Sequence, residues 1–226
     1  MKIYAVNIEQ LKIKNLFYEA YEMVDEVRKE KVDACRREED KLRSLGAGLL
    51  FAYALAETLN SSWSVLKDQI SFEYGEHEKP YLKPWKGICF NLSHSGSYAV
   101  CAITVGENLY EYEEKNEVGI DIQKLIPCNL RTGKKAFSEA ECKRLEALLL
   151  QDEKKAALEF SKLWSNKESR GKLLGTGVFL QESEEKEVFG REYEFAGEYI
   201  VSVAGFEDCF VEEVCEMRID ELMNIL

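Results

Sequence analysis

A carboxylate on a short strand is the first feature of this sequence that could do chemistry. Residues 118–123 read VGIDIQ, which alternates between a branched apolar face and a face that carries Asp121. Gly119 and Gln123 share that second face. A carboxylate beside apolar side chains is costly to bury unless a positive group meets it. The pattern therefore indicates either a site where Asp121 meets positive charge, or an edge strand whose polar face lies in water.

A second candidate lies on a helix. Four residues spaced four apart would form one slowly drifting stripe on that helix: Phe160, Trp164, Glu168 and Lys172. The two aromatic side chains must be buried, so the stripe predicts that Glu168 and Lys172 point into a cleft at the rim of the core. The alternative is an exposed Glu–Lys pair at i,i+4, worth about 0.3–0.5 kcal/mol.

A third candidate is the hydroxyl-rich segment at residues 91–97, which reads NLSHSGS and ends an apolar strand. Its hydroxyls and glycine offer hydrogen-bond donors and an open backbone to a phosphate group. Ser93 and His94 are not a nucleophile–base pair, because neighbouring strand residues point to opposite faces. Taken alone, His94 is more typical of a structural hydrogen-bonding residue than of a catalyst.

Two similar sets of elements must position these residues, one on each side of the acidic stretch at 107–117. In the first half we expect a strand near 2–8, helices over about 16–60, and strands near 70–74, 88–93 and 98–105. In the second half we expect a strand at 118–123, helices near 138–151 and 153–174, and strands near 176–181, 192–196 and 199–206. Ser138 and Glu141 form a capping-box pattern at the start of a helix. The repeated order predicts an α+β fold, a pseudo-symmetric duplication of two similar α/β subdomains, with halves at 1–113 and 114–226.

Length, charge and cysteine use narrow the class of protein. The 226 residues are 46% hydrophobic, which is typical of a soluble globular chain. Lys and Arg number 30 against 42 Asp and Glu, and a net charge of −12 disfavours nucleic acid as the main partner. No apolar run reaches the roughly 18 residues of a membrane span, and the N-terminus reads directly into a strand without a signal-peptide core. The seven cysteines contain no CxxC pair, and several lie in apolar runs, so we expect reduced thiols and a cytoplasmic location.

Taken in order, these segments resemble the 4′-phosphopantetheinyl transferase superfamily. The closer match is its long, duplicated branch, which activates peptide synthetases such as surfactin synthetase. Four motifs carry the resemblance: FNLSHS at 90–95, VGIDI at 118–122, FSEAE at 137–141, and WSNKES at 164–169 followed by Lys172 and Gly175. Outlying matches are Glu39, Asp40, Arg43, Ser44 and the Lys-Pro pair at 79–80. The resemblance runs from Met1 to about Phe179.

The resemblance implies transfer of the 4′-phosphopantetheine group from coenzyme A to a serine of an acyl or peptidyl carrier protein. The carrier changes from its apo to its holo form, and adenosine 3′,5′-bisphosphate is released. Cleaving the pyrophosphate calls for Mg²⁺, or Mn²⁺ in its place, because a hard cation neutralises phosphate charge. The implied metal ligands are Asp121 and Glu168, with Gln123, direct or through water, where many relatives have Glu.

The resemblance also implies catalytic and coenzyme-binding roles. Asp121, Glu168 and Lys172 would be the catalytic set: Glu168, or a water that it holds, takes the proton of the carrier serine. Lys172 would neutralise phosphate charge and could protonate the leaving group. The implied contacts to coenzyme A are Arg28, Lys31, Arg43, Ser44, Lys79, Ser93, His94 and Lys172.

Coenzyme A and a carrier protein are thus the expected partners of a chain that acts as a monomer. The pattern leaves open whether the carrier belongs to a fatty-acid, polyketide or peptide synthetase. A non-catalytic module of the same fold, which binds coenzyme A or a carrier protein, is the alternative, and a scaffold without a ligand is a third. The presence of Asp121, Glu168 and Lys172 together favours the enzyme.

A basic segment at 131–144 predicts where the carrier docks. Carrier proteins of this class are typically acidic, so the net charge of −12 opposes their approach and local basic surface must compensate. The segment supplies Arg131, Lys134, Lys135, Lys143 and Arg144. Phe137 lies among them and is predicted to be an apolar anchor, since interfaces combine a buried aromatic with a charged rim.

Overall fold

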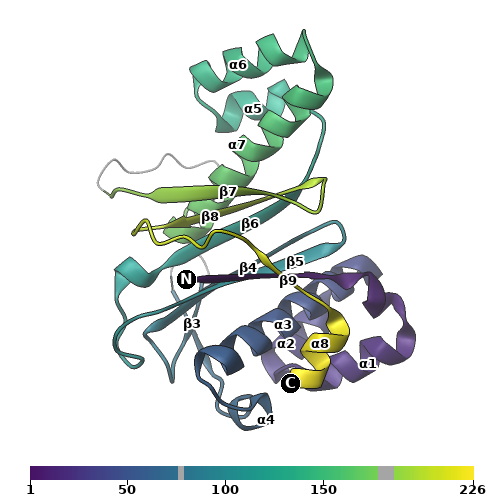
Figure 1. Ribbon diagram of the computed structural model, residues 1–226, viewed down its shortest axis with the longest axis vertical. Coiled ribbons are helices and arrows are strands. Elements are labelled where there is room, and N and C mark those ends of the chain that lie inside the picture. Colours follow the sequence, from purple (N-terminus) through teal and green to yellow (C-terminus); the bar gives the residue numbers. More distant parts are fainter. Residues whose placement is uncertain (76–78, 178–185) are drawn as a thin grey trace.

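Two β-sheets lie along the middle of the molecule, with helices at both ends (Figure 1). The computed structural model describes residues 1–75, 79–177 and 186–226 of the chain. The first sheet has the strand order β4-β5-β1-β9 and contains β1 (Lys2–Asn7), β4 (Ile88–Ser95), β5 (Tyr98–Val105) and β9 (Cys215–Met217). The second has the order β6-β8-β7 and contains β6 (Val118–Lys124), β7 (Phe189–Phe195) and β8 (Tyr199–Gly205). A separate hairpin joins β2 (Phe72–Tyr74) and β3 (Pro80–Leu82).

The helices are distributed between the two ends of the molecule (Figure 1). The first half contributes the 3-10 turn η1 (Ile8–Lys12), α1 (Lys14–Met23), α2 (Glu26–Ala34), α3 (Glu38–Thr58) and α4 (Trp63–Leu66). The turn η3 (Glu114–Asn116) precedes β6. The second half contributes α5 (Leu130–Ala136), α6 (Glu139–Leu149), α7 (Glu153–Leu174) and α8 (Ile219–Ile225). Ser138 and Glu141 form the predicted capping box at the start of α6.

One topology occurs twice in the chain. In each half a first strand leads into helices, the longest being α3 or α7, and then into an antiparallel hairpin. The second strand of the hairpin pairs antiparallel with the first strand of the half, so β4-β5-β1 corresponds to β7-β8-β6. The predicted α+β fold with two similar halves is therefore confirmed.

Three apolar clusters hold these layers together. The largest packs α3 against one face of the first sheet, and includes Tyr4 and Val6 of β1. The second lies between the sheets, where Ile3 and Ala5 of β1 share a cluster with the apolar face of β6. Both faces of β1 are therefore buried, as in the centre of a layered domain. The third, smaller cluster joins α5, α6 and α7.

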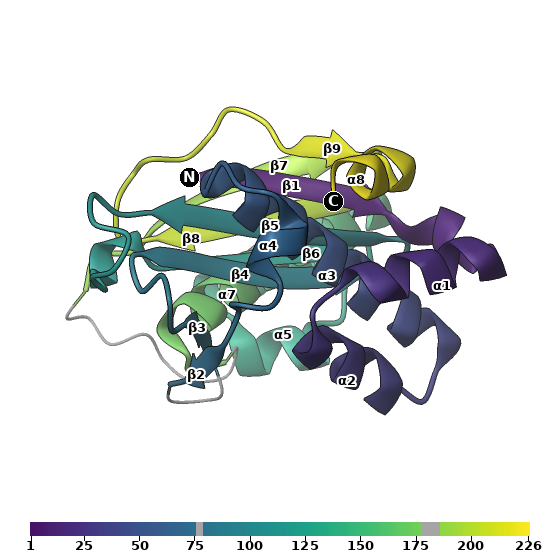
Figure 2. The same cartoon turned by 90° about the horizontal axis from the view of Figure 1, so that it is seen from below.

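The last two elements return to the first half. β9 pairs parallel with β1, with Tyr4 opposite Cys215. α8 packs on α3, and its Ile219 and Leu222 are fully buried in the large cluster (Figure 2). The division into 1–113 and 114–226 remains a proposal, and in space β9 and α8 lie with the first half.

Some expected elements differ from those observed. The strand expected near 176–181 lies mostly outside the described residues, and its described part, Thr176 and Gly177, is not a strand. β3, α4, α5, β9 and α8 were not expected. Among the described residues, no helix is both long and apolar enough to cross a bilayer. All seven cysteines are free thiols.

Candidate active site

Asp121 lies in the middle of β6, on the face that α7 covers. A Cβ atom at Gly119 would lie 2.0 Å from the carbonyl oxygen of Ser169 and 2.5 Å from the amide nitrogen of Leu173. The backbone of α7 therefore rests directly on the strand, and only glycine leaves room for it. Small side chains continue this contact along the helix, because Ser161, Ser165 and Ser169 are all fully buried. The Ser165 hydroxyl donates to the Asp121 carbonyl at 3.5 Å.

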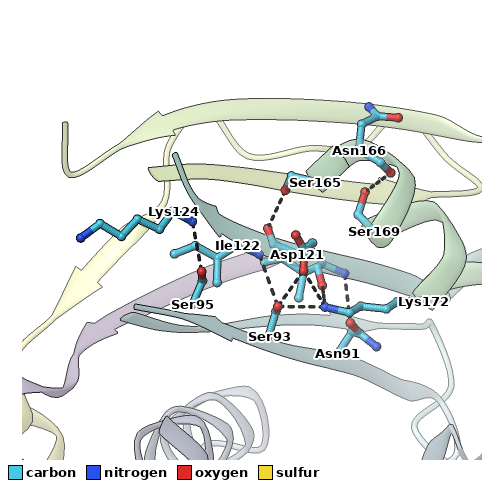
Figure 3. A network of polar contacts seen from close by, with 11 residues as sticks. Asn91, Ser93, Ser95, Asp121, Ile122, Lys124, Ser165, Asn166, Ser169 and Lys172 are labelled. Atoms are coloured by element: carbon cyan, nitrogen blue, oxygen red, sulfur yellow. Dashed lines mark hydrogen bonds and ion pairs between the residues drawn. The ribbon is translucent and has the colours of Figure 1, made fainter. Parts of the chain in front are cut away.

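The buried carboxylate of Asp121, only 6% exposed, is met by a positive charge. Lys172 Nζ lies 2.8 Å from Asp121 Oδ1 and also donates to the Ser93 hydroxyl at 2.8 Å (Figure 3). The Ser93 hydroxyl in turn donates to Asp121 Oδ1 at 2.9 Å. β6 is an edge strand of its sheet, but its polar face is covered by α7 and does not lie in water. The first of the two interpretations of this strand is the one observed.

Glu168 lies one turn before Lys172 on α7 and is half-buried. Within the described part of the chain, no group forms a hydrogen bond or ion pair with its carboxylate. Burial, and then the charge of Asp121, raise the pKa of Glu168, while Lys172 acts in the opposite direction. Glu168 and Lys172 line a pocket of about 370 Å³, together with Lys79, Asn91 and the backbone around Gly175. The charged end of the stripe thus faces a cleft, as predicted. Phe160 is buried, also as predicted, but Trp164 is only half-buried because it lines a separate groove, so that part of the prediction is wrong.

The hydroxyl-rich segment joins the two sheets. The Asn91 side-chain oxygen accepts from the Ile120 amide at 3.1 Å, and the Ser95 hydroxyl accepts from the Lys124 amide at 3.1 Å. Between them, Ser93 accepts from the Ile122 amide at 3.4 Å. Three alternate side chains of β4 therefore satisfy the backbone donors along the free edge of β6, which has no strand partner there (Figure 3). These three hydrogen bonds from β6 to β4 place Ser93 beside Asp121.

A second pocket, of about 240 Å³, carries positive charge. Arg28, Lys31 and His94 line it among aromatic and aliphatic side chains, with Asp25 as the acidic residue of the lining. Partial desolvation in this pocket, followed by the nearby charge of Arg43, lowers the pKa of His94, although the residue keeps an exposed face. Burial also lowers the pKa of Arg28, although a guanidinium stays charged. Asn91 lines both pockets, so the two adjoin.

The structure gathers most of the predicted site residues around these two pockets. Lys79, Glu168 and Lys172 line the first, and Asp121 and Ser93 are bonded to Lys172 beside it. Arg28, Lys31 and His94 line the second. Arg43 is close to His94, but its guanidinium is bound to Asp40 at 2.6 Å and to the Gly96 carbonyl at 3.2 Å. Ser44 is buried in α3. Gln123 is half-buried, and its amide nitrogen donates to the Lys124 carbonyl at 2.7 Å.

The prediction for Phe137 is wrong. Its side chain is only 9% exposed and packs against Phe160 at a ring distance of 5.5 Å, inside the apolar cluster that joins α5, α6 and α7, so it is not available to a docking partner. The five basic side chains of 131–144 are exposed, as expected. The apolar surface near them is instead a groove of about 610 Å³, lined among others by Ile126, Leu130 and Trp164.

Two further features of the site were not anticipated. The serines at 161, 165 and 169 are spaced four apart and form a stripe of small residues beside the aromatic stripe. This spacing could have predicted that one face of the helix packs closely on a neighbouring element. Asn91, Ser93 and Ser95 are spaced two apart, which would have indicated that Asn91 shares the face of Ser93.

Comparisons with known proteins agree with this geometry. The family model described as the N-terminal part of 4′-phosphopantetheinyl transferase matches residues 12–106, and the model of the 4′-phosphopantetheinyl transferase superfamily matches residues 117–195. A 4′-phosphopantetheinyl transferase of Bacillus subtilis is 32% identical over 183 residues, covering 80% of this chain and 73% of the relative. The transferase psf-1 of Bacillus pumilus is 30% identical over 181 residues, covering 79% and 70%. Sfp of Bacillus subtilis strain 168 is 32% identical over 154 residues, covering 67% and 61%.

The chain therefore belongs to the 4′-phosphopantetheinyl transferase superfamily. Within that superfamily it is a 4′-phosphopantetheinyl transferase similar to the Sfp-like members.

Proposed function

We propose that this chain moves the 4′-phosphopantetheine group of coenzyme A onto a serine of an acyl or peptidyl carrier protein and releases adenosine 3′,5′-bisphosphate. The observation that carries the proposal is the meeting of Asp121, Glu168 and Lys172 beside one pocket that adjoins a second, cationic pocket. The first half supplies Asn91 and Lys79 to this site, and the second half supplies Glu168 and Lys172. One chain thus contains both sides of the site, which supports activity as a monomer.

The two pockets suit the nucleotide and the pyrophosphate of coenzyme A. Arg28, Lys31 and His94 offer positive charge and hydrogen-bond donors to the phosphates of the nucleotide. From there the coenzyme would pass Asn91, which lines both pockets, so that its pyrophosphate lies against Lys172 and Glu168. The hydroxyl of Ser93, two residues further along β4 than Asn91, is bound to Lys172 and Asp121.

The donor set fits a hard divalent cation. Asp121 and Glu168 are two carboxylates near one pocket, and the described residues contain no group of three His, Cys, Asp or Glu side chains that could hold a metal. Two carboxylates completed by substrate phosphates and water are the usual environment of Mg²⁺ in phosphate chemistry. Asp121 and Glu168 would hold the ion, with Gln123 as a third ligand, direct or through water. When bound, Mg²⁺ or Mn²⁺ supplies neutralisation of the pyrophosphate charge.

The remaining steps fall to the residues of the chain. The serine oxygen of the carrier attacks the phosphorus next to pantetheine, and the bond from that phosphorus to the oxygen of the nucleotide phosphate breaks. Glu168, or a water that it holds, accepts the serine proton, and its raised pKa makes it a stronger base than an ordinary glutamate. Lys172 is positioned to neutralise the charge that develops on the leaving phosphate and to give it a proton.

Mass spectrometry of apo carrier proteins tests the proposal. Fatty-acid, polyketide and peptide carriers are each incubated with the chain, coenzyme A and Mg²⁺, and each carrier is compared with a version whose acceptor serine is replaced by alanine. A mass gain of one phosphopantetheine group, on the serine version only, is expected for at least one carrier.

The non-catalytic alternative predicts a different pattern. Coenzyme A would then raise the melting temperature of the chain without any carrier gaining mass, and that result would contradict the proposal. A scaffold without a ligand would show neither the thermal shift nor the mass gain.

A further inference from the structure

A second buried ion pair adjoins the pocket, and its acidic member, Glu117, has no part in the chemistry described so far. Lys79 and Glu117 form a salt bridge in which the side chains are 8% and 4% exposed. Lys79 comes directly before β3, and Glu117 directly before β6. The pair therefore links the hairpin of the first half to the start of the strand that carries Asp121. A buried ion pair that links separate elements requires an explanation, because burying two charges is costly.

Lys79 also binds the end of α7. Its ammonium donates to the Leu173 carbonyl at 3.1 Å. This carbonyl belongs to the last turn of the helix, where Gly175 in the left-handed conformation (φ 70°) forms the C-cap. Carbonyls in that turn lack partners within the helix, and a positive charge there is favourable. Lys79 thus closes the helix at the residue next to Lys172.

Glu117 is in turn fixed by aromatic hydroxyls. Tyr112 donates its hydroxyl proton to Glu117 Oε1 at 2.8 Å. Tyr81 also faces this carboxylate: burial, and then the charge of Glu117, raise the pKa of Tyr81. Tyr112 therefore holds one carboxylate oxygen of Glu117, while the other oxygen forms the ion pair with Lys79.

We infer that Glu117 and Lys79 are positioning residues for the transfer reaction. Glu117 orients Lys79, and Lys79 fixes the last turn of α7, so that Glu168 and Lys172 keep their places beside Asp121. The inference rests on the proposed function. It gives Lys79 a different task from the contact to the nucleotide that the family resemblance implies.

A double-mutant cycle separates the two tasks of Lys79. Lys79→Met, Glu117→Gln and the double variant are compared for kcat and for KM of coenzyme A. For positioning residues, each single variant should lower kcat by about 10- to 100-fold, since small misplacements at an active site have effects of this size. The double variant should be no slower than the slower single variant, because both changes remove the same contact. A Lys79→Met variant with raised KM for coenzyme A, together with a Glu117→Gln variant of unchanged kcat, would overturn the inference.

Hydrogen exchange provides a readout that does not need activity. In the ligand-free chain, the amides in the last turn of α7 should exchange faster in both single variants than in the parent. Glu114→Gln is the matched control, because Glu114 forms an exposed ion pair with Lys186, and it should leave both kcat and exchange unchanged. If Glu117→Gln does not fold, Tyr112→Phe removes one donor to Glu117 from a more exposed position and should lower kcat in the same direction. Unchanged exchange in all variants contradicts the inference, whereas faster exchange in a chain that modifies no carrier contradicts only the proposed function.

Discussion

Asp121 and Glu168 are two carboxylates of one site with very different surroundings. Asp121 is buried and held by Lys172 and Ser93. Glu168 is half-buried and lacks a hydrogen-bond or ion-pair partner among the described residues. A fixed carboxylate suits a structural ligand, while one without a partner can exchange a proton during the reaction. The difference in environment therefore predicts different roles, with Asp121 as a fixed ligand and Glu168 as the group that exchanges a proton.

Replacing Glu168 by Gln tests this division. The variant keeps the shape of the side chain but removes the base, so transfer should fall by at least about 100-fold. The mass gain of an apo carrier over time measures the rate, and circular dichroism checks the fold. A variant with near-normal turnover would show that Glu168 is neither the base nor a metal ligand.

The same variant should change the dependence of stability on pH. Because the folded chain raises the pKa of Glu168, its ionised form lowers the free energy of unfolding. This decrease in the free energy of unfolding is absent below the ordinary glutamate pKa, grows as pH rises, and is complete above the raised pKa. In urea denaturation, Glu168→Gln should therefore match the parent at low pH and be slightly more stable at neutral pH. Lower stability of the variant at neutral pH would mean that the carboxylate has a stabilising partner.

Gln123 is the point where this chain departs from the pattern that the family resemblance implies. Gln123→Glu restores a negative charge on the strand face of Asp121, and it should lower the Mg²⁺ concentration needed for half-maximal activity. Calorimetric titration of Mg²⁺ into the coenzyme A complex gives a second measurement. Unchanged affinity in both would place Gln123 away from the metal.

At the scale of elements, the position of α7 on β6 decides whether the site exists. The contact at Gly119 leaves no space for a side chain, since an added Cβ would lie 2.0 Å from a backbone oxygen of the helix. Gly119→Ala must push α7 away from the strand, and Glu168 and Lys172 move with it.

We expect Gly119→Ala to lower the free energy of unfolding by about 1–3 kcal/mol. It should also lower kcat, and by at least as much as substitutions of exposed residues do. Gly190→Ala in β7 is the matched control, because its added Cβ would meet its nearest neighbour at an ordinary 3.4 Å. Urea denaturation and the carrier assay are run on both. Equal stability of the two variants would contradict the close contact of α7 with β6.

Elements with strong local patterns could be predicted, and elements defined by distant contacts could not. The alternation of residues 118–123 and the capping box at Ser138 are local, and both are observed. β9 is three residues long and exists through its pairing with β1, about 210 residues earlier in the chain, so no local pattern marks it. The ion pair of Lys79 with Glu117 depends in the same way on the fold. Phe137 was misassigned because a basic neighbourhood in sequence does not show which way an aromatic ring points.

At the scale of the whole molecule, the charge distribution opposes the proposed partner. The chain has a net charge of −12, and the exposed basic side chains of 131–144 lie at the end formed by α5 and α6 (Figure 1). An acidic carrier should therefore be attracted at this end and repelled elsewhere. The apolar groove lined by Ile126, Leu130 and Trp164 lies next to these charges and replaces Phe137 as the candidate contact.

Reversing two of these charges tests the docking surface. Lys134→Glu with Lys135→Glu should raise the KM for carrier protein several-fold and leave that for coenzyme A nearly unchanged. The effect should shrink with added salt, since exposed charges are screened over about 8 Å at physiological ionic strength.

The control reverses the charges of Lys12 and Lys14, which are exposed in the first half. Lys12 forms an exposed ion pair with Glu9, as Lys134 does with Glu146. This pair of changes alters net charge equally and should have little effect on either KM. If the variant of Lys134 and Lys135 weakens coenzyme A binding instead, the basic segment belongs to the nucleotide pocket.

The return of β9 and α8 to the first half has a consequence for biosynthesis. Both elements follow the second half in the chain, so a ribosome makes the outer strand of the first sheet only after all of the second sheet. Until then, the edge of β1 is unpaired and the place of Ile219 and Leu222 on α3 is empty. At about 5–20 residues per second, synthesis of the chain from the end of β5 to β9 takes on the order of 10 s. During that time the nascent first half presents an open strand edge to chaperones and to neighbouring chains, and a message truncated before β9 would make that exposure permanent.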